Sequence, residues 1–274
     1  MLLINLNMKK RNFFLFLLNV LILFHPTGCD SIKDTDQDRQ IAISFTAEGL
    51  SGTLLKSAAS SDEKIISKIL LFGVDENRSE VIHTFKSTSS DTSIILSRKV
   101  KWLYAIANPS ADIEETTFTT VSQLIDLTGD FTVAPVSPFL MSGIAELPYA
   151  SASVNINLVR AVAKIEIVNT ETDFVIESVT VDKTPAKGYV FSRTSLSVPT
   201  SSRVTYFYSA DDLAINSSIY VAENNSNQTE FAVIGKFRGI RMIYIFGLTS
   251  NGGQNVEIKR NTCYQVDISF ESDE

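Results

Sequence analysis

The sequence predicts an all-β protein made of β-sandwich domains. From Ile41 onward, short apolar runs and stretches of alternating apolar and polar residues recur, and Gly, Ser, Asn and Pro separate them. Period-two alternation between turn-forming residues is typical of half-buried strands. The chain of 274 residues is also long enough for two small domains after its N-terminal segments. We therefore expect two β-sandwiches in tandem, an N-terminal domain at residues 41–150 and a C-terminal domain at residues 151–274.

The elements expected in the first half begin with a short strand. Ile41, Ile43 and Phe45 alternate with small or polar residues and share one face of that strand. Residues 119–127 are the one segment expected to be helical, because apolar residues follow a threonine there at helical spacing. Residues 130–142 contain two prolines and are expected to be irregular. The other strands expected in this half are 65–74, 81–85, 92–96 and 102–107.

The second half opens with strong alternation over residues 154–168, which predicts one long strand. Near the C-terminus, Asn251 and Gly252 supply the positive φ angles of a tight turn. They predict a hairpin between residues 242–248 and a strand near Val256. The other strands expected in this half are 175–181, 219–222, 231–237 and 264–270.

Residues 1–28 are typical of a lipoprotein signal peptide. Basic residues at 9–11 precede an apolar run at 13–24, which is too short to span a bilayer stably. Gly28 stands directly before Cys29, and a lipoprotein peptidase cuts before a cysteine that carries a diacylglyceryl group. We expect lipidation, including palmitate, on Cys29. A plain signal peptide and an uncleaved anchor are the alternatives, and Met8 is an alternative start.

Residues 29–40 are expected to form a flexible tether. They are rich in aspartate and contain almost no apolar side chain, so they bury too little surface to offset chain entropy. An acidic run directly after the lipid cysteine resembles, in Bacteroidetes-type bacteria, the signal that sends lipoproteins to the outer face of the outer membrane. We therefore expect an outer-membrane lipoprotein at the cell surface.

Composition excludes several classes of function. The chain has 24 basic and 31 acidic residues, three of the basic ones lie in the signal peptide, and no basic patch stands out, so nucleic-acid binding is not expected. Beyond the signal peptide and Cys29, His83 and Cys263 are the remaining histidine and cysteine. An intramolecular disulfide is then impossible in a lipidated product, and a zinc site of several Cys and His ligands is excluded. Cys263 is expected to be a small buried hydrophobe.

No catalytic site is expected. The acid pairs 114–115 and 211–212 resemble the two carboxylates of a glycosidase only in type, because neighbouring residues on a strand point to opposite faces. Both pairs are expected in solvated loops, or with the second at a short helical turn. His83, expected to face solvent, lacks the context of a catalytic triad, and no phosphate or dinucleotide motif is present. We expect no enzyme activity, cofactor or metal.

Five stretches resemble the fimbrillins of Bacteroidales, the FimA and Mfa families of pilus subunits and their anchors. They occur in the family's order across most of the mature chain: 102–109 (WLYAIANP), 139–143 (FLMSG), 158–167 (LVRAVAKIEI), 219–224 (IYVAEN) and 258–266 (IKRNTCYQV). The resemblance implies two transthyretin-like Greek-key β-sandwich domains, secretion as a lipoprotein and assembly into a surface fimbrium.

The resemblance also implies an assembly mechanism. In these pili a trypsin-like protease removes the first strand after an Arg or Lys, and a strand from a neighbouring subunit fills the groove that opens. The strand to be removed here is 41–45, with Ile41, Ile43 and Phe45 as its buried face. Lys56 is the best-placed residue for the cut, because the segment around it is loose and polar. Lys64 is expected to be less accessible, and a cut at Arg39 would remove only the tether.

In stalk subunits the donor strand follows the stretch matched by residues 260–264. The chain stops at Glu274, so no donor strand is evident, and we expect a tip or minor subunit with a possible ligand on a host or bacterial surface. A non-polymerising lipoprotein and an anchor are the alternatives.

A glycan-binding surface lipoprotein of a nutrient-uptake system is the alternative from a different class. Such proteins expose aromatic platforms. Here Trp102 is expected in the core, and residues 206–208 (YFY) are the exposed-aromatic candidate, although half-buried strand positions are the simpler reading.

Overall fold

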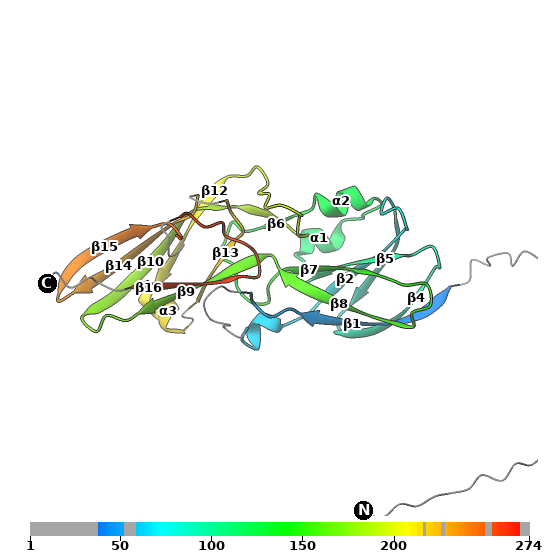
Figure 1. Ribbon diagram of the computed structural model, residues 1–274, viewed down its shortest axis with the longest axis horizontal. Coiled ribbons are helices and arrows are strands. Elements are labelled where there is room, and N and C mark those ends of the chain that lie inside the picture. The colour runs from blue at the N-terminus through cyan, green and yellow to red at the C-terminus, as the bar shows by residue number, and fades with distance from the viewer. Residues whose placement is uncertain (1–37, 52–58, 216–217, 226–227, 250–253, 269–274) are drawn as a thin grey trace, which may run out of the picture. The chain divides into compact units, whose positions relative to one another are not determined.

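The computed structural model describes residues 38–51, 59–215, 218–225, 228–249 and 254–268. The expected signal peptide, the lipid site Cys29, the cleavage candidate Lys56 and the Asn251-Gly252 turn lie outside the described residues. Within the described part, no helix is both long and apolar enough to cross a membrane. Strands are the predominant secondary structure of the described residues and are arranged in four sheets, so the prediction of an all-β sandwich fold is confirmed (Figure 1).

Seven strands form the largest sheet, in the order β3-β2-β5-β7-β8-β1-β4. β1 is antiparallel to β4 and parallel to β8. Buried side chains of β1, β4 and β8 share one core with those of β2 and β5. The two halves of this sheet therefore face each other as the layers of a sandwich. The strands are β1 (Arg39–Ala47), β2 (Ile69–Val74), β3 (Val81–Ser87), β4 (Asp91–Leu96), β5 (Trp102–Ala107), β7 (Met141–Glu146) and β8 (Ser153–Arg160).

The opposite face of β2 and β5 is covered by two short helices, α1 (Ala111–Glu115) and α2 (Val121–Ile125). All six residues of β2 are buried, because one set of alternate side chains enters the sandwich core and the other meets these helices. Thr120 caps α2 in a capping box with Gln123. The single helix expected over residues 119–127 is thus present but shorter.

The rest of the chain builds a second sandwich. The sheet β12-β10-β14-β15 packs against the sheet β13-β9-β16, and their inward side chains form one core. Cys263 is 9% exposed in β16, as its sequence context predicted. The strands are β9 (Val162–Asn169), β10 (Phe174–Pro185), β12 (Arg203–Ser209), β13 (Ser218–Ala222), β14 (Glu230–Phe237), β15 (Ile240–Phe246) and β16 (Cys263–Ile268); a small sheet joins β6 (Thr128–Asp130) to β11 (Lys187–Tyr189).

The single long strand expected over residues 154–168 is wrong. The chain leaves the seven-stranded sheet at the end of β8 and enters the three-stranded sheet at the start of β9. Arg160, Ala161 and Val162 are all buried, which interrupts the period of two at the crossing. The alternation on either side is regular enough to hide this break, because both strands have one buried face.

Three further expectations need correction. Met141 begins β7 inside the segment expected to be irregular. More than one segment is helical, since α1, α3 (Ala210–Ile215) and the 3₁₀ helix η1 (Asp62–Lys64) accompany α2. His83 is half-buried rather than solvent-facing, and its Nε2 accepts a hydrogen bond from the Ser97 N–H at 3.4 Å.

Candidate functional site

The first strand of the described chain occupies an interior position in its sheet. β1 pairs with β4 from Arg39 opposite Leu96 to Ser44 opposite Asp91. On its other side it pairs with β8, from residue 42 to residue 47. Both backbone edges of β1 are therefore hydrogen-bonded. Removing it would expose two unpaired strand edges, those of β4 and β8.

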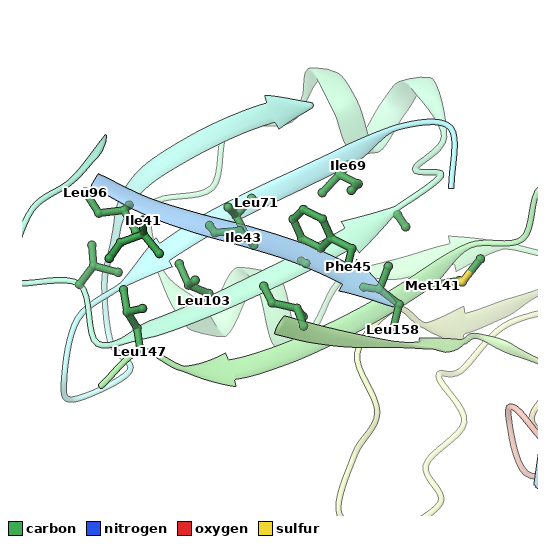
Figure 2. Packing of buried hydrophobic residues seen from close by; sticks show 14 residues of the cluster. Ile41, Ile43, Phe45, Ile69, Leu71, Leu96, Leu103, Met141, Leu147 and Leu158 are labelled. Carbon is green, nitrogen blue, oxygen red and sulfur yellow. The ribbon is translucent and has the colours of Figure 1, made fainter. Parts of the chain in front are cut away.

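The side chains of β1 fill the core on one face only. Ile41, Ile43 and Phe45 are 1%, 2% and 5% exposed, whereas Ala42 and Thr46 on the other face are exposed and Ser44 is half-buried. Figure 2 shows the three buried side chains along one face of β1, directed towards β2 and β5 across the core. Burial of each stabilises the fold by about 1.5–3 kcal/mol. β1 therefore contributes three buried side chains to the core of the first sandwich.

Arg39 belongs to β1 and not to the tether, which was expected to extend to residue 40. Its Nη1 donates to the Pro148 carbonyl at 3.1 Å and also to the Tyr149 carbonyl, and its Nη2 donates to the Val100 carbonyl at 3.4 Å. A cut after Arg39 would thus remove these contacts but leave nearly all of β1 in place.

The four residues after β1, which we call the junction segment (residues 48–51), are hydrogen-bonded to residues of both sandwiches. The Glu48 N–H donates to the Leu158 carbonyl at 2.9 Å. The Ser51 N–H donates to the Asn261 carbonyl at 2.9 Å, and the Ser51 carbonyl accepts from the Cys263 N–H at 2.7 Å. The junction segment is therefore hydrogen-bonded at both ends, to β8 and to the start of β16.

Arg160 lies beneath the junction segment and is 0% exposed. Its Nη1 donates to the Glu48 carbonyl at 2.8 Å and to Asn261 Oδ1 at 2.7 Å, and its Nε donates to the Glu63 carbonyl at 2.8 Å. Burial lowers the pKa of Arg160, since desolvation disfavours the charged form. Arg160 thus binds the chain on both sides of residues 52–58, the segment that contains Lys56.

Glu63 anchors the chain after residues 52–58. It is 2% exposed, accepts a hydrogen bond from the Ser60 N–H at 2.8 Å and forms an ion pair with Lys164 at 3.1 Å. The Tyr220 hydroxyl also donates to its carboxylate. Burial disfavours the charge of Lys164, but the carboxylates of Glu166 and Glu63 raise the pKa of Lys164 above its ordinary value. The segment with the expected cleavage site therefore connects two firmly held points.

The other residues singled out in the sequence do not assemble into a catalytic arrangement. Glu114 pairs with Lys68 at 2.9 Å on the surface, and Asp212 accepts a hydrogen bond from the Ser209 N–H at 2.8 Å at the start of α3. Lys64 is exposed at the end of η1. In the described part of the chain, no three metal-ligating side chains form a group.

The aromatic candidates divide between core and surface. Tyr206 is buried, and its hydroxyl donates to the Phe131 carbonyl at 2.5 Å, whereas Phe207 is 66% exposed. Trp102 is half-buried rather than fully in the core, and the Arg78 guanidinium lies 3.4 Å from its ring centroid. A cavity of about 540 Å³ is lined by Phe139, Phe207, Tyr208, Tyr220, Asp62 and Asp212, among other residues.

Arg160, Asn261 and Glu63 have no assigned role from sequence, although the first two lie in stretches that carry the family resemblance. The one available signal was Arg160 itself, a charged residue within the apolar run of residues 158–163. Such a residue is buried only when its donors find acceptors. Its acceptors come from residues 48, 63 and 261, which are distant in the sequence, so the pattern alone did not identify them.

No protein-family model and no curated protein matches the sequence. Solved structures do match. A candidate cell adhesion protein from Bacteroides eggerthii has a TM-score of 0.61 and 15% identity, covering 84% of this chain and 85% of that one. A fimbrial assembly protein from Parabacteroides distasonis has a TM-score of 0.59 and 15% identity, covering 84% and 91%. The tip fimbrial protein Mfa3 from Porphyromonas gingivalis, with a C-terminal truncation, has a TM-score of 0.58 and 14% identity, covering 86% and 96%.

The chain therefore shares the fold of Bacteroidales cell adhesion and fimbrial proteins, in agreement with the resemblance in its sequence.

Proposed function

We propose that this protein is a fimbrial subunit at the cell surface that joins its neighbours by strand exchange. The observation that carries the proposal is the position of β1. It is the first strand of the described chain, it lies between β8 and β4, and it fills the core with Ile41, Ile43 and Phe45. A strand at the start of a chain leaves after a single cut. An incoming strand then restores both ladders and refills the pockets, which is the physics of β-augmentation.

The cut that we propose follows Lys56. Residues 52–58 join the junction segment to residues anchored by Glu63. Cleavage there separates β1 from the rest of the chain and cuts none of the strands that form the core. Before the cut, a lipid on Cys29 anchors the protein in the outer membrane. After the cut, the partners are other fimbrial subunits. We also propose that the two sandwiches are separate domains, with the boundary at Ala161 between β8 and β9 instead of at residue 150.

Limited trypsin digestion of the chain without its signal peptide tests this proposal. Intact mass measurement is expected to find a cut after Lys56, and the Lys56→Gln variant is expected to remain uncut there. The cut protein is then mixed with an excess of a fluorescent peptide of residues 38–51. We expect the peptide to replace β1 in the cut protein and not in the Lys56→Gln protein. Uptake by neither protein would refute strand exchange through this site.

Within a fimbrium, we propose a tip or minor position, supported by the fold shared with a tip fimbrial protein. An anchor and a non-polymerising lipoprotein are the other candidates. Immunogold labelling of fimbriae distinguishes them: a tip subunit is expected at the distal ends, an anchor at the cell surface, and a non-polymerising lipoprotein over the membrane and on no fimbria.

Binding of a glycan is a second candidate function, favoured by the cavity beside β12. Aromatic rings of Phe139, Phe207 and Tyr208 line it together with the carboxylate of Asp212. Pockets lined by aromatic side chains with a few polar groups are the usual form of small-ligand sites. A glycan array tests this candidate. Phe207→Ala is expected to abolish binding, and the exposed Ile245→Ala, on β15, is expected to leave it unchanged. If no glycan on the array binds, glycan binding is refuted as a function of this cavity.

A further inference from the structure

Arg160 and Asn261, which we call the backbone clasp, hold the junction segment by its main chain. Arg160 Nη1 donates to the Glu48 carbonyl at 2.8 Å, and Asn261 Nδ2 donates to the Gly49 carbonyl at 2.9 Å. The Asn261 carbonyl accepts from the Ser51 N–H at 2.9 Å. These three bonds involve peptide groups of the junction segment, and its one side-chain bond to the clasp is from Ser51 Oγ to the Asn261 carbonyl at 3.2 Å. The clasp is therefore able to bind segments of different sequence, provided that they are extended.

The clasp is itself built in a fixed geometry. Asn261 has a φ of 54°, in the left-handed region that Asn tolerates better than most residues. This conformation lets its side chain accept from Arg160 at 2.7 Å while Nδ2 reaches the Gly49 carbonyl. Arg160 and Asn261 are 0% and 6% exposed. Arg160 Nε also donates to the Glu63 carbonyl at 2.8 Å, and the Asn261 N–H donates to the Val162 carbonyl at 2.7 Å, so both residues are also bonded to parts of the chain outside the junction segment.

The buried charge of Arg160 needs a hydrogen-bond acceptor at the position that the Glu48 carbonyl occupies. Among the described residues, Arg160 Nη2 has no hydrogen-bond partner. Loss of the junction segment would remove one of the two acceptors of Nη1 as well. A buried cation with unsatisfied donors is costly, so the site favours any segment that returns a carbonyl to it.

We propose that the backbone clasp is a second recognition site for the incoming strand, separate from the apolar pockets of β1. This inference rests on the proposed strand exchange. The partner segment would be extended and about 13 residues long: nine residues that replace β1 and four that replace the junction segment. It would carry apolar side chains at the positions of Ile41, Ile43 and Phe45. It would not carry proline at the position of Glu48 or Ser51, where an N–H is donated.

The test uses the full mature chain with a specific protease site placed within residues 52–58 and cut. Two fluorescent peptides, one of residues 38–51 and one of residues 38–47, compete for the place of β1 between β8 and β4, which we call the slot. The long peptide is expected to bind roughly tenfold more tightly or better, because only it returns the bonds of the clasp. In the long peptide, Ser51→Pro is expected to lose a measurable part of this gain, because it has no N–H for the Asn261 carbonyl to accept. Ser51→Ala, which keeps the N–H and loses only the 3.2 Å bonds of the hydroxyl group, is expected to retain most of it.

A variant of the clasp gives the complementary measurement. Asn261→Gly tolerates the positive φ but has no side-chain amide, so the long peptide is expected to lose most of its advantage. Arg238→Gly, at an exposed position with a φ of 50°, is the matched control and is expected to preserve it. If Asn261→Gly does not fold, the two Ser51 peptides on the unsubstituted protein decide the question.

Each result has a definite meaning. Equal binding of the long and short peptides would overturn the clasp and leave strand exchange intact. An unchanged advantage in Asn261→Gly, or equal binding of the Ser51→Pro and Ser51→Ala peptides, would also overturn it. Binding of neither peptide would refute strand exchange, and the clasp as a recognition site with it.

Discussion

Truncation of Ile43 measures how much β1 contributes to the core. The side chain is 2% exposed at the middle of β1, among buried residues from both layers of the sandwich. Ile43→Ala removes three carbon atoms, each contributing about 0.8 kcal/mol of transfer free energy, or about 2.4 kcal/mol in total. The cavity left between two rigid layers adds to this loss. We expect the free energy of unfolding to fall by about 3 kcal/mol.

Equilibrium unfolding in urea is the assay. Trp102 is the one tryptophan of the chain and lies on β5 in the same sheet, so its fluorescence reports on this sandwich. Thr46→Ala is the control: its side chain is exposed, with a 3.0 Å hydrogen bond to Asn155, and we expect a change within about 0.5 kcal/mol. If Ile43→Ala destabilises the protein no more than Thr46→Ala does, β1 is not part of a rigid core, and the reasoning about its slot fails.

Three further predictions concern other parts of the chain. Gly143→Ala is expected to lower the free energy of unfolding by at least about 3 kcal/mol, because the new Cβ would lie 2.2 Å from a backbone oxygen of β8. Urea unfolding measures the loss, and Gly49→Ala, whose new Cβ would have nothing within 4 Å, is the control. Equal losses in the two variants would contradict the prediction. Glu223→Leu leaves the buried Arg260 without its carboxylate and is expected to cost about 3–5 kcal/mol by the same assay; a loss below about 1 kcal/mol would refute it. The Thr132 N–H donates to the Asp130 carboxylate and lowers the pKa of Asp130 below its ordinary value of 3.8. The contribution of Asp130 to stability is therefore present above pH 3.8 and is lost as the pH falls through the lowered pKa. The melting-temperature difference between the unsubstituted protein and Asp130→Asn is expected to shrink on acidification, and a difference that grows would contradict this.

The sequence predicted strands whose alternation is set by one buried face. The strand expected at 102–107 is β5, and the face of Ile41, Ile43 and Phe45 is the buried face of β1. It did not predict β7, since Gly143 lowers the strand signal there. The glycine is needed because β8 passes too close for a side chain. Local patterns carry no information about that approach.

The sequence likewise predicted one part of the candidate site and not the other. Apolar periodicity identified the side chains that fill the slot, because burial of alternate residues is a local property. The backbone clasp was not identified, because Arg160 and Asn261 meet main-chain atoms of residues 48 and 49 only after both sandwiches have formed. Main-chain acceptors are the same at every position, so no sequence pattern distinguishes the carbonyl that a buried guanidinium selects.

The mixed pairing of β1 has a consequence for the assembly as a whole. β1 runs parallel to β8 and antiparallel to β4. A replacement strand entered backwards would meet the wrong hydrogen-bonding pattern on both sides, so the slot admits a chain in one direction. A filament joined by the proposed strand exchange would therefore be polar, with a head-to-tail repeat and two chemically different ends. Growth and termination then belong to opposite ends of the same fibre.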